Sequence, residues 1–172
     1  MSFTKDGKLF ILVKKMIGQL TEMQMDALLH KEIVGRIGCH SKDMVYVVPI
    51  SYVYDGECIY GHTFEGLKIR TMRENPHVCF EVDDLHDMAN WQSVIAWGVF
   101  KEIVKEEERN YALHLLLKRP LPFVSSVTTH LGASWPFVSE DTDVIDGIVF
   151  KIMISKKTGK FESSSSSPLM NG

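Results

Sequence analysis

The segment Met44–Tyr54, with the sequence MVYVVPISYVY, constrains the fold more than any other part of the chain. β-Branched and aromatic residues fill it, and such residues favour extended strands. Asp55 and Gly56 follow directly, and this pair is typical of a tight turn between antiparallel strands. We therefore expect a β-hairpin whose second strand covers residues 57–62.

Hydrophobic periodicity predicts the remaining elements of the chain. Further strands are expected at 9–13, 33–40, 77–82, 91–104 and 145–155, and helices at 22–31, 67–73 and 106–118. Thr21 and Gln24 have the spacing of a capping box, which marks the start of the first helix. Strands and helices do not alternate, which argues against a doubly wound parallel sheet. The expected fold class is mainly β (α+β), an antiparallel split β-barrel with a few peripheral helices.

The length of 172 residues suits one domain. We expect a single domain over residues 1–160. The serine-rich stretch at 161–172 cannot form a core and is expected to be a flexible tail. Residues 83–90 are expected to form an acidic loop. The spacing of its Asp and His residues fits no metal-binding loop, so a solvated loop is the favoured interpretation and no metal is predicted.

Charge and cysteine content narrow the possible partners and location. The chain has 19 Lys and Arg against 22 Asp and Glu, and this balance gives no sign of nucleic-acid binding. No apolar run approaches the roughly 20 residues of a membrane span. Its 3 cysteines form no close pairs, which is typical of a reducing compartment. We therefore expect a cytoplasmic protein with neither nucleic acid nor membrane as a partner.

Pro49 interrupts an otherwise strong strand pattern. Because proline has no amide proton, strand pairing is expected to be disturbed there. The neighbouring amides of Val48 and Ile50 would then be free to meet the edge of a planar heterocycle. The alternative is an edge strand or bulge with no ligand.

The second candidate site lies where the return strand ends and the short helix 67–73 begins. Lys68 falls in the first helical turn, and helix N-terminal amides together with a lysine can bind a phosphate. Thr63 adds a hydroxyl donor, and His62 can act as a donor or a titrating group near neutral pH. The alternative is a solvated amphipathic helix.

Trp91 and Ser93 open the strand 91–104, which is expected to bend at Gly98. Alternation places both side chains on one face, where they could contact an aromatic ring and its edge. The alternative is a tryptophan that caps the barrel. Trp135, in the ambiguous stretch 123–143, is a further exposed aromatic candidate.

Five short motifs in this order resemble the pyridoxamine 5′-phosphate oxidase-like flavin-binding split barrels, and in particular the nitroimidazole-resistance (Nim) branch. They read VGRIG, YVVPISYVYDG, IYGHT-x-x-G-x-K, RENPHVCFEVD and W-x-S-V-I-x-x-G, and they fall within residues 20–104. The resemblance implies a homodimer with FMN at the subunit interface. The domain 1–160 would then be an FMN-binding split barrel.

The same resemblance implies roles for individual residues. The strand beside the flavin ring corresponds to Tyr46 and the cofactor-binding residues Val47, Val48, Pro49, Ile50 and Ser51. Lys68 matches the phosphate-binding lysine of the family. His62 matches a histidine that the Nim branch places next to the flavin, which makes it the catalytic candidate. Ser93 matches a position where pyridoxamine phosphate oxidases usually have a glutamine. Trp91 and Trp135, which are candidates from their sequence context alone, complete the expected cofactor-binding set.

Two departures from the family pattern argue against oxidation of pyridoxamine phosphate itself. Leu67 stands where those oxidases often have an arginine beside the phosphate-binding lysine. The stretch 130–150 is acidic and contains no Arg or Lys, although those oxidases bind substrate with basic residues there. The phosphate of such a substrate would lack a cation.

The leading hypothesis is therefore an FMN-binding oxidoreductase that transfers electrons from reduced flavin to a small acceptor, with nitro-aromatic compounds as one class. The alternative is a non-catalytic module that binds FMN or haem. In the haem case a histidine such as His62 would be an axial ligand.

Overall fold

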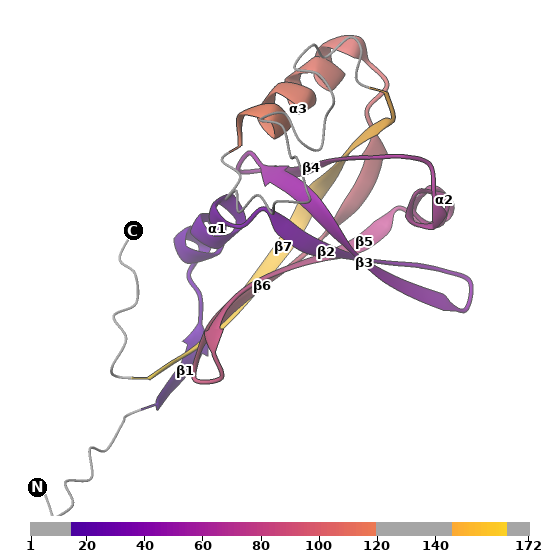
Figure 1. Cartoon of the computed structure of the whole chain (residues 1–172). Coiled ribbons are helices and arrows are strands. Elements are labelled where there is room, and N and C mark those ends of the chain that lie inside the picture. Colours follow the sequence, from indigo (N-terminus) through magenta and orange to yellow (C-terminus); the bar gives the residue numbers. More distant parts are fainter. Residues whose placement is uncertain (1–14, 120–145, 165–172) are drawn as a thin grey trace, which may run out of the picture.

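The computed structural model of the chain describes residues 15–119 and 146–164, as drawn in colour in Figure 1. The elements run in the order β1 (Lys15–Gln19), α1 (Glu22–Lys31), β2 (Val34–Ser41), β3 (Met44–Tyr54), β4 (Cys58–Thr63), α2 (Leu67–Glu74), β5 (His77–Asp87), β6 (Asn90–Glu102), α3 (Glu106–Lys118) and β7 (Ile148–Ser164). The expected strand at 9–13 lies outside the described residues.

All strand pairings are antiparallel, in the order β1-β7-β4-β3-β2-β5-β6. β7 also pairs with β6, so the sheet closes into a barrel, and β1 extends its far end along β7. The pairing of β6 with β7 shifts register between Trp97 and Gly98, where the bend was expected. The predicted antiparallel split barrel with a few helices is confirmed.

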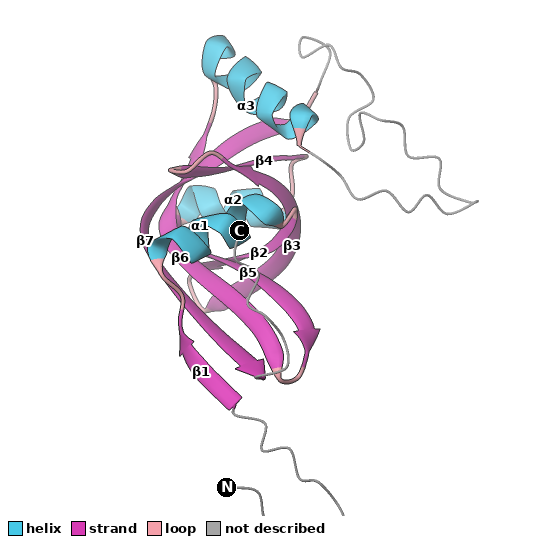
Figure 2. Cartoon of the chain, turned by 90° about the vertical axis from the view of Figure 1, so that its left-hand side faces the viewer, coloured by secondary structure: helices cyan, strands magenta, loops and turns pink. Residues whose placement is uncertain are grey.

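Two helices close the barrel and complete its core, and Figure 2 shows α1 and α2 framed by the strands. Leu28 and Leu29 of α1 and Ile69 and Met72 of α2 are at most 2% exposed. They join one apolar cluster with the inward side chains of the strands. The third helix, α3, packs instead on the outside of β4 and forms a second cluster with Tyr60.

The predicted start of α1 is also confirmed. The Gln24 amide lies 3.3 Å from the Thr21 hydroxyl oxygen, and the Thr21 amide donates to the Gln24 side chain at 2.9 Å. This reciprocal pair satisfies two amides that the helix itself cannot.

One strand was missed, and two expected boundaries are wrong. Strand β1 was not predicted, and the expected acidic loop at 83–90 is largely strand, because β5 runs to Asp87 and β6 starts at Asn90. Strand β7 runs to Ser164, so residues 161–164 are part of the barrel extension rather than of a tail. The serines are held there because β1 pairs with them and Asn90 Oδ1 accepts from the Ser164 amide at 2.9 Å.

Gly98→Ala is expected to lower the free energy of unfolding by about 1–3 kcal/mol through overpacking. A Cβ at this position would lie 2.5 Å from the carbonyl oxygen of Met153, a backbone atom that cannot move without disturbing β7. Gly38→Ala is the matched control, since its Cβ would meet nothing closer than 3.6 Å. Urea denaturation compares the two, and equal midpoints would contradict the prediction.

Candidate functional site

β3 and β4 separate along one side of the barrel. β3 pairs with β2 along its length from Met44 to Ser51, but it pairs with β4 only from Tyr52 to Tyr54. Beyond that point β4 continues along β7 to Thr63. In the part of the chain that the structure describes, residues 44–51 therefore have no strand partner on the β4 side. We call this side of β3 the open edge.

The phase of hydrogen bonding determines which amides of β3 face the open edge. The Tyr52 amide donates to the Ile33 carbonyl at 3.0 Å, on the β2 side. Since hydrogen-bonded and non-hydrogen-bonded pairs alternate in an antiparallel ladder, the amides of Val48 and Ile50 also face β2. The expectation that these two amides are free was wrong.

The alternate residues supply the backbone groups of the open edge. By the same alternation, the amides and carbonyls of Val47 and Ser51 face away from β2. Pro49 lies between them, opposite Arg36 in a pair without ladder hydrogen bonds. The missing amide proton of Pro49 therefore removes no hydrogen bond between β3 and β2, as is usual for proline at a strand edge. The edge therefore offers backbone donors and acceptors that no strand of the described chain uses.

His62 lies next to the point of separation. Gly61 is the last β4 residue paired with β3, so His62 follows directly on the outer side of the barrel. Its Nε2 lies 2.6 Å from the backbone oxygen of Asp146. Burial lowers the pKa of His62 below its ordinary value, against the opposing effect of the Asp146 carbonyl. Burial therefore favours the neutral form of the ring.

Lys68 provides a cation at the start of α2. The helix begins at Leu67, and its N-cap Gly66 has no side chain to cap the first-turn amides. Lys68 is half-buried, and burial lowers the pKa of its ammonium group. None of the described carboxylates forms an ion pair with it. A desolvated ammonium beside uncapped helix amides is an arrangement that suits a phosphate.

Nearby polar groups have partners within the chain. The Thr63 hydroxyl donates to the Phe64 carbonyl at 3.2 Å. Arg73 binds Glu65 at 2.8 Å and also Glu102. The predicted phosphate donors thus reduce to Lys68 and the helix amides, with Thr63 positioned in the same loop.

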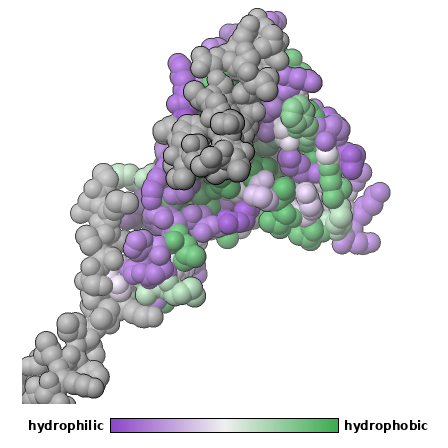
Figure 3. Space-filling view, viewed as in Figure 1, coloured by the Kyte–Doolittle hydropathy of each residue, from purple (hydrophilic) through white to green (hydrophobic). Residues whose placement is uncertain are grey.

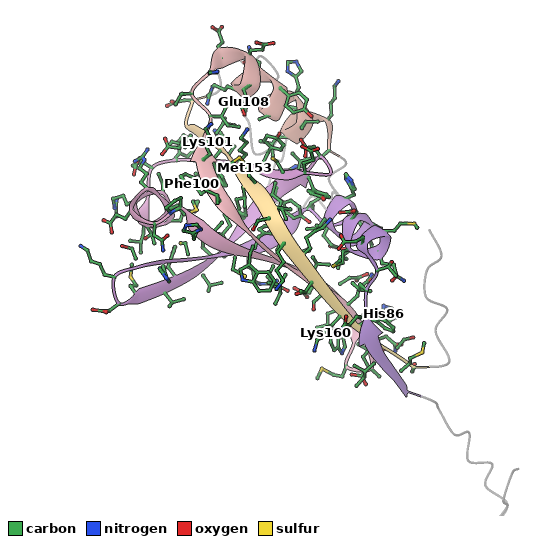
Figure 4. All side chains as sticks on the ribbon, turned by 180° about the vertical axis from the view of Figure 1, so that it is seen from behind. His86, Phe100, Lys101, Glu108, Met153 and Lys160 are labelled. Carbon is green, nitrogen blue, oxygen red and sulfur yellow. The ribbon has the colours of Figure 1, made fainter. Side chains whose placement is uncertain are left out.

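Within one chain, the structure does not place Trp91 and Ser93 next to Lys68 or the open edge of β3. Trp91 donates its Nε1 proton to Glu162 at 3.2 Å, and Ser93 lies opposite Asp83 and Lys160. Figure 4 marks this end of the sheet with His86 and Lys160, whereas Lys101 and Met153 lie towards α3. Trp135 lies outside the described residues.

Trp91, Ser93 and the open edge nevertheless share one surface, which we call the outer face. Residues paired across neighbouring strands point to the same side of a sheet. One such row joins Val47 of β3, Gly38 of β2, Cys79 of β5 and Trp97 of β6. Ser93 lies on the same side as Trp97, because alternate residues of a strand share a face.

Sequence reasoning missed the contact of His62 with Asp146 and Gly147. The available signal was the Asp-Gly pair directly before the last strand, which is typical of a turn. Among the described residues, no group of three or more His, Cys, Asp and Glu side chains is arranged to hold a metal. Within the same residues, no helix has the length and apolar character needed to cross a membrane.

Comparison with known proteins adds independent findings. A family model described as pyridoxamine 5′-phosphate oxidase matches residues 21–134. Over 91 residues the chain is 33% identical to an uncharacterized protein of Rhizobium meliloti (strain 1021). That match covers 51% of this chain and spans 60% of the length of the curated relative.

Solved structures share the fold. A FAD-binding protein from Mesorhizobium loti is 25% identical with a TM-score of 0.66, covering 87% of this chain and 99% of that chain. A candidate 5-nitroimidazole antibiotic resistance protein from Bacteroides thetaiotaomicron is 16% identical with a TM-score of 0.66, covering 95% and 98%. The second likeness concerns the fold alone. With the family model matching more than half of its length, this chain belongs to the pyridoxamine 5′-phosphate oxidase family.

Proposed function

We propose that the chain binds FMN at the open edge of β3 and acts as a flavin-dependent oxidoreductase on a small acceptor. The observation that carries the proposal is Lys68, a half-buried cation without a carboxylate partner among the described residues, at the uncapped start of α2. The open edge of β3, with backbone groups that lack a strand partner in the described chain, supports a ring next to it. A bound flavin supplies the electron transfer, and the protein supplies binding and orientation.

Each group of residues has a separate task in this proposal. Lys68 and the first amides of α2 bind the phosphate. The backbone of Val47, Pro49 and Ser51 meets the polar edge of the ring and fixes its orientation. His62, at the point where β3 and β4 separate, contacts the reacting side and acts as the catalytic residue.

A homodimer completes the site. Trp91 and Ser93 lie on the outer face but several strands from Ser51, so one chain alone does not bring them to the ring. A two-fold axis through the outer face would place these residues of one protomer against the open edge of its partner. The resemblance to flavin-binding split barrels, which implies an interface site, supports this arrangement.

The acceptor class is part of the proposal, and the motif resemblance to the nitroimidazole-resistance branch supports it. The Mesorhizobium loti protein is described as FAD-binding, and the Bacteroides thetaiotaomicron protein as a candidate 5-nitroimidazole resistance protein. We propose FMN as the flavin and small nitro-aromatic compounds as acceptors. The absence of Arg and Lys from 130–150 argues against a phosphorylated acceptor.

The absorption spectrum of the purified full-length protein, followed by mass analysis of the released cofactor, tests the proposal. A flavin spectrum with released FMN, and reoxidation of the reduced protein by a nitro compound, would support it. Released FAD would correct the cofactor. A Soret band would favour the haem-binding alternative, and FMN bound without reoxidation by any acceptor would favour a non-catalytic carrier. If the purified protein is colourless and does not bind added FMN, the proposal is overturned.

A further inference from the structure

The contact between His62 and the Asp146 backbone identifies the protonated nitrogen of the ring. Nε2 lies 2.6 Å from the Asp146 carbonyl oxygen, which can only accept a hydrogen bond. Nε2 therefore carries a proton. In the neutral form of the ring, which burial favours, this is the single N–H and the lone pair lies on Nδ1.

The turn that supplies this carbonyl is built tightly around the ring. Gly147 has a φ of 101°, which L side chains rarely adopt. A Cβ at Gly147 would lie 2.8 Å from His62 Nε2 and 2.8 Å from the Thr63 carbonyl oxygen. The Gly147 amide donates to Asp146 Oδ1 at 2.6 Å, and this hydrogen bond within the turn stabilises its conformation. Glycine is thus required here by both conformation and space.

A cation from α3 holds the other side of the turn. Arg109 Nη1 donates to the Gly147 carbonyl at 3.2 Å. The guanidinium also affects the ring directly, since its charge lowers the pKa of His62 in addition to the larger effect of burial. The Asp146 carbonyl and carboxylate act in the opposite direction. Arg109 therefore links α3, the 146–147 turn and the protonation of His62.

We propose that Arg109, Asp146 and Gly147 form a positioning clamp, which holds His62, the residue beside the proposed flavin site, as the Nε2–H tautomer. The inference rests on the proposed function only for the identity of the site. Its consequence is chemical. In this tautomer Nδ1 can only accept a hydrogen bond, whereas in an imidazolium it would donate one.

Long-range ¹H–¹⁵N NMR of the full-length, histidine-labelled protein reads the tautomer directly, before and after addition of FMN. His62→Gln assigns the signals. Wild-type protein is expected to show the Nε2–H tautomer of His62 in both states. Arg109→Gln is expected to give a tautomer mixture and a raised His62 pKa, and Arg109→Lys to remain closer to wild type. Lys118→Gln removes a charge from the exposed end of the same helix and is the matched control.

Activity gives a second measurement on the flavin-loaded protein. His62→Gln should retain FMN but slow reduction of a nitro acceptor, and Arg109→Gln should shift the pH profile of that rate. An Nδ1–H tautomer in the wild type, or an unchanged tautomer and pKa in Arg109→Gln, would overturn the clamp even where FMN binds normally. The expected tautomers in a protein that binds no flavin would support the clamp and overturn the proposed function instead. Gly147→Ala provides a further test where that variant folds.

Discussion

Lys68→Ala is expected to weaken FMN binding about ten- to hundredfold, since a charge-assisted hydrogen bond contributes roughly 1.5–3 kcal/mol. The ammonium group is already partly desolvated in the free protein, and burial lowers its pKa. A phosphate restores the interactions that burial removes, so much of the binding free energy should depend on this residue. Quenching of flavin fluorescence by wild-type and variant protein measures the two dissociation constants.

The neighbouring arginines supply the control. Arg73 forms ion pairs with Glu65 and Glu102. Arg36 forms ion pairs with Glu81, at 3.0 Å, and with Asp83. Arg70 is exposed on the same short helix as Lys68. Arg70→Ala therefore removes one positive charge from α2 and should leave FMN affinity within a few-fold of wild type. Equal affinities of the wild type and Lys68→Ala would remove Lys68 from the phosphate site and return the role to one of these arginines.

Elements specified by local signals were predictable from sequence. The β3–β4 hairpin follows from the apolar alternation of Met44–Tyr54 and from Asp55-Gly56, and α1 follows from its capping box. Lys68 was placed in the first turn of α2 because the strand end, the glycine and the helix lie within a few residues of one another. These signals depend on interactions between close neighbours in the chain.

Features specified by distant partners were not predictable in this way. Asp83 and Asp84 are strand through their pairing with Ser93 and Gln92 of β6. Cations from other elements lie against their carboxylates, Arg36 at 2.5 Å from Asp83 and Lys31 at 2.6 Å from Asp84. The direction of the Val48 amide depends on pairing between Ile33 and Tyr52, which a single strand pattern does not contain. The end of β7 is a strand only because β1 and β6 flank it.

Val47→Asp is expected to convert the proposed dimer to monomer and to abolish most FMN binding. The reason lies in the outer face, where Val45 is 75% exposed, Val47 60% and Trp97 39%. Figure 3 shows hydrophobic residues mixed with hydrophilic ones around the β2–β3 hairpin at the right of the view. Exposed apolar side chains gathered on one sheet face are typical of a protein interface. A carboxylate there would have to be buried without a partner on association, at a cost of several kcal/mol.

The control for this variant is Val104→Asp, which introduces the same charge at a position that is 85% exposed between β6 and α3, away from the outer face. Sedimentation at micromolar protein, with and without FMN, follows mass and bound flavin together. The proposed site needs Trp91 and Ser93 of the second protomer. Val47→Asp should therefore lose both the dimer and the bound flavin, and Val104→Asp should keep both. A monomeric Val47→Asp protein that still binds FMN stoichiometrically would show that one chain contains the whole site. The open edge and Lys68 would then be sufficient, and the outer face would have no part in flavin binding.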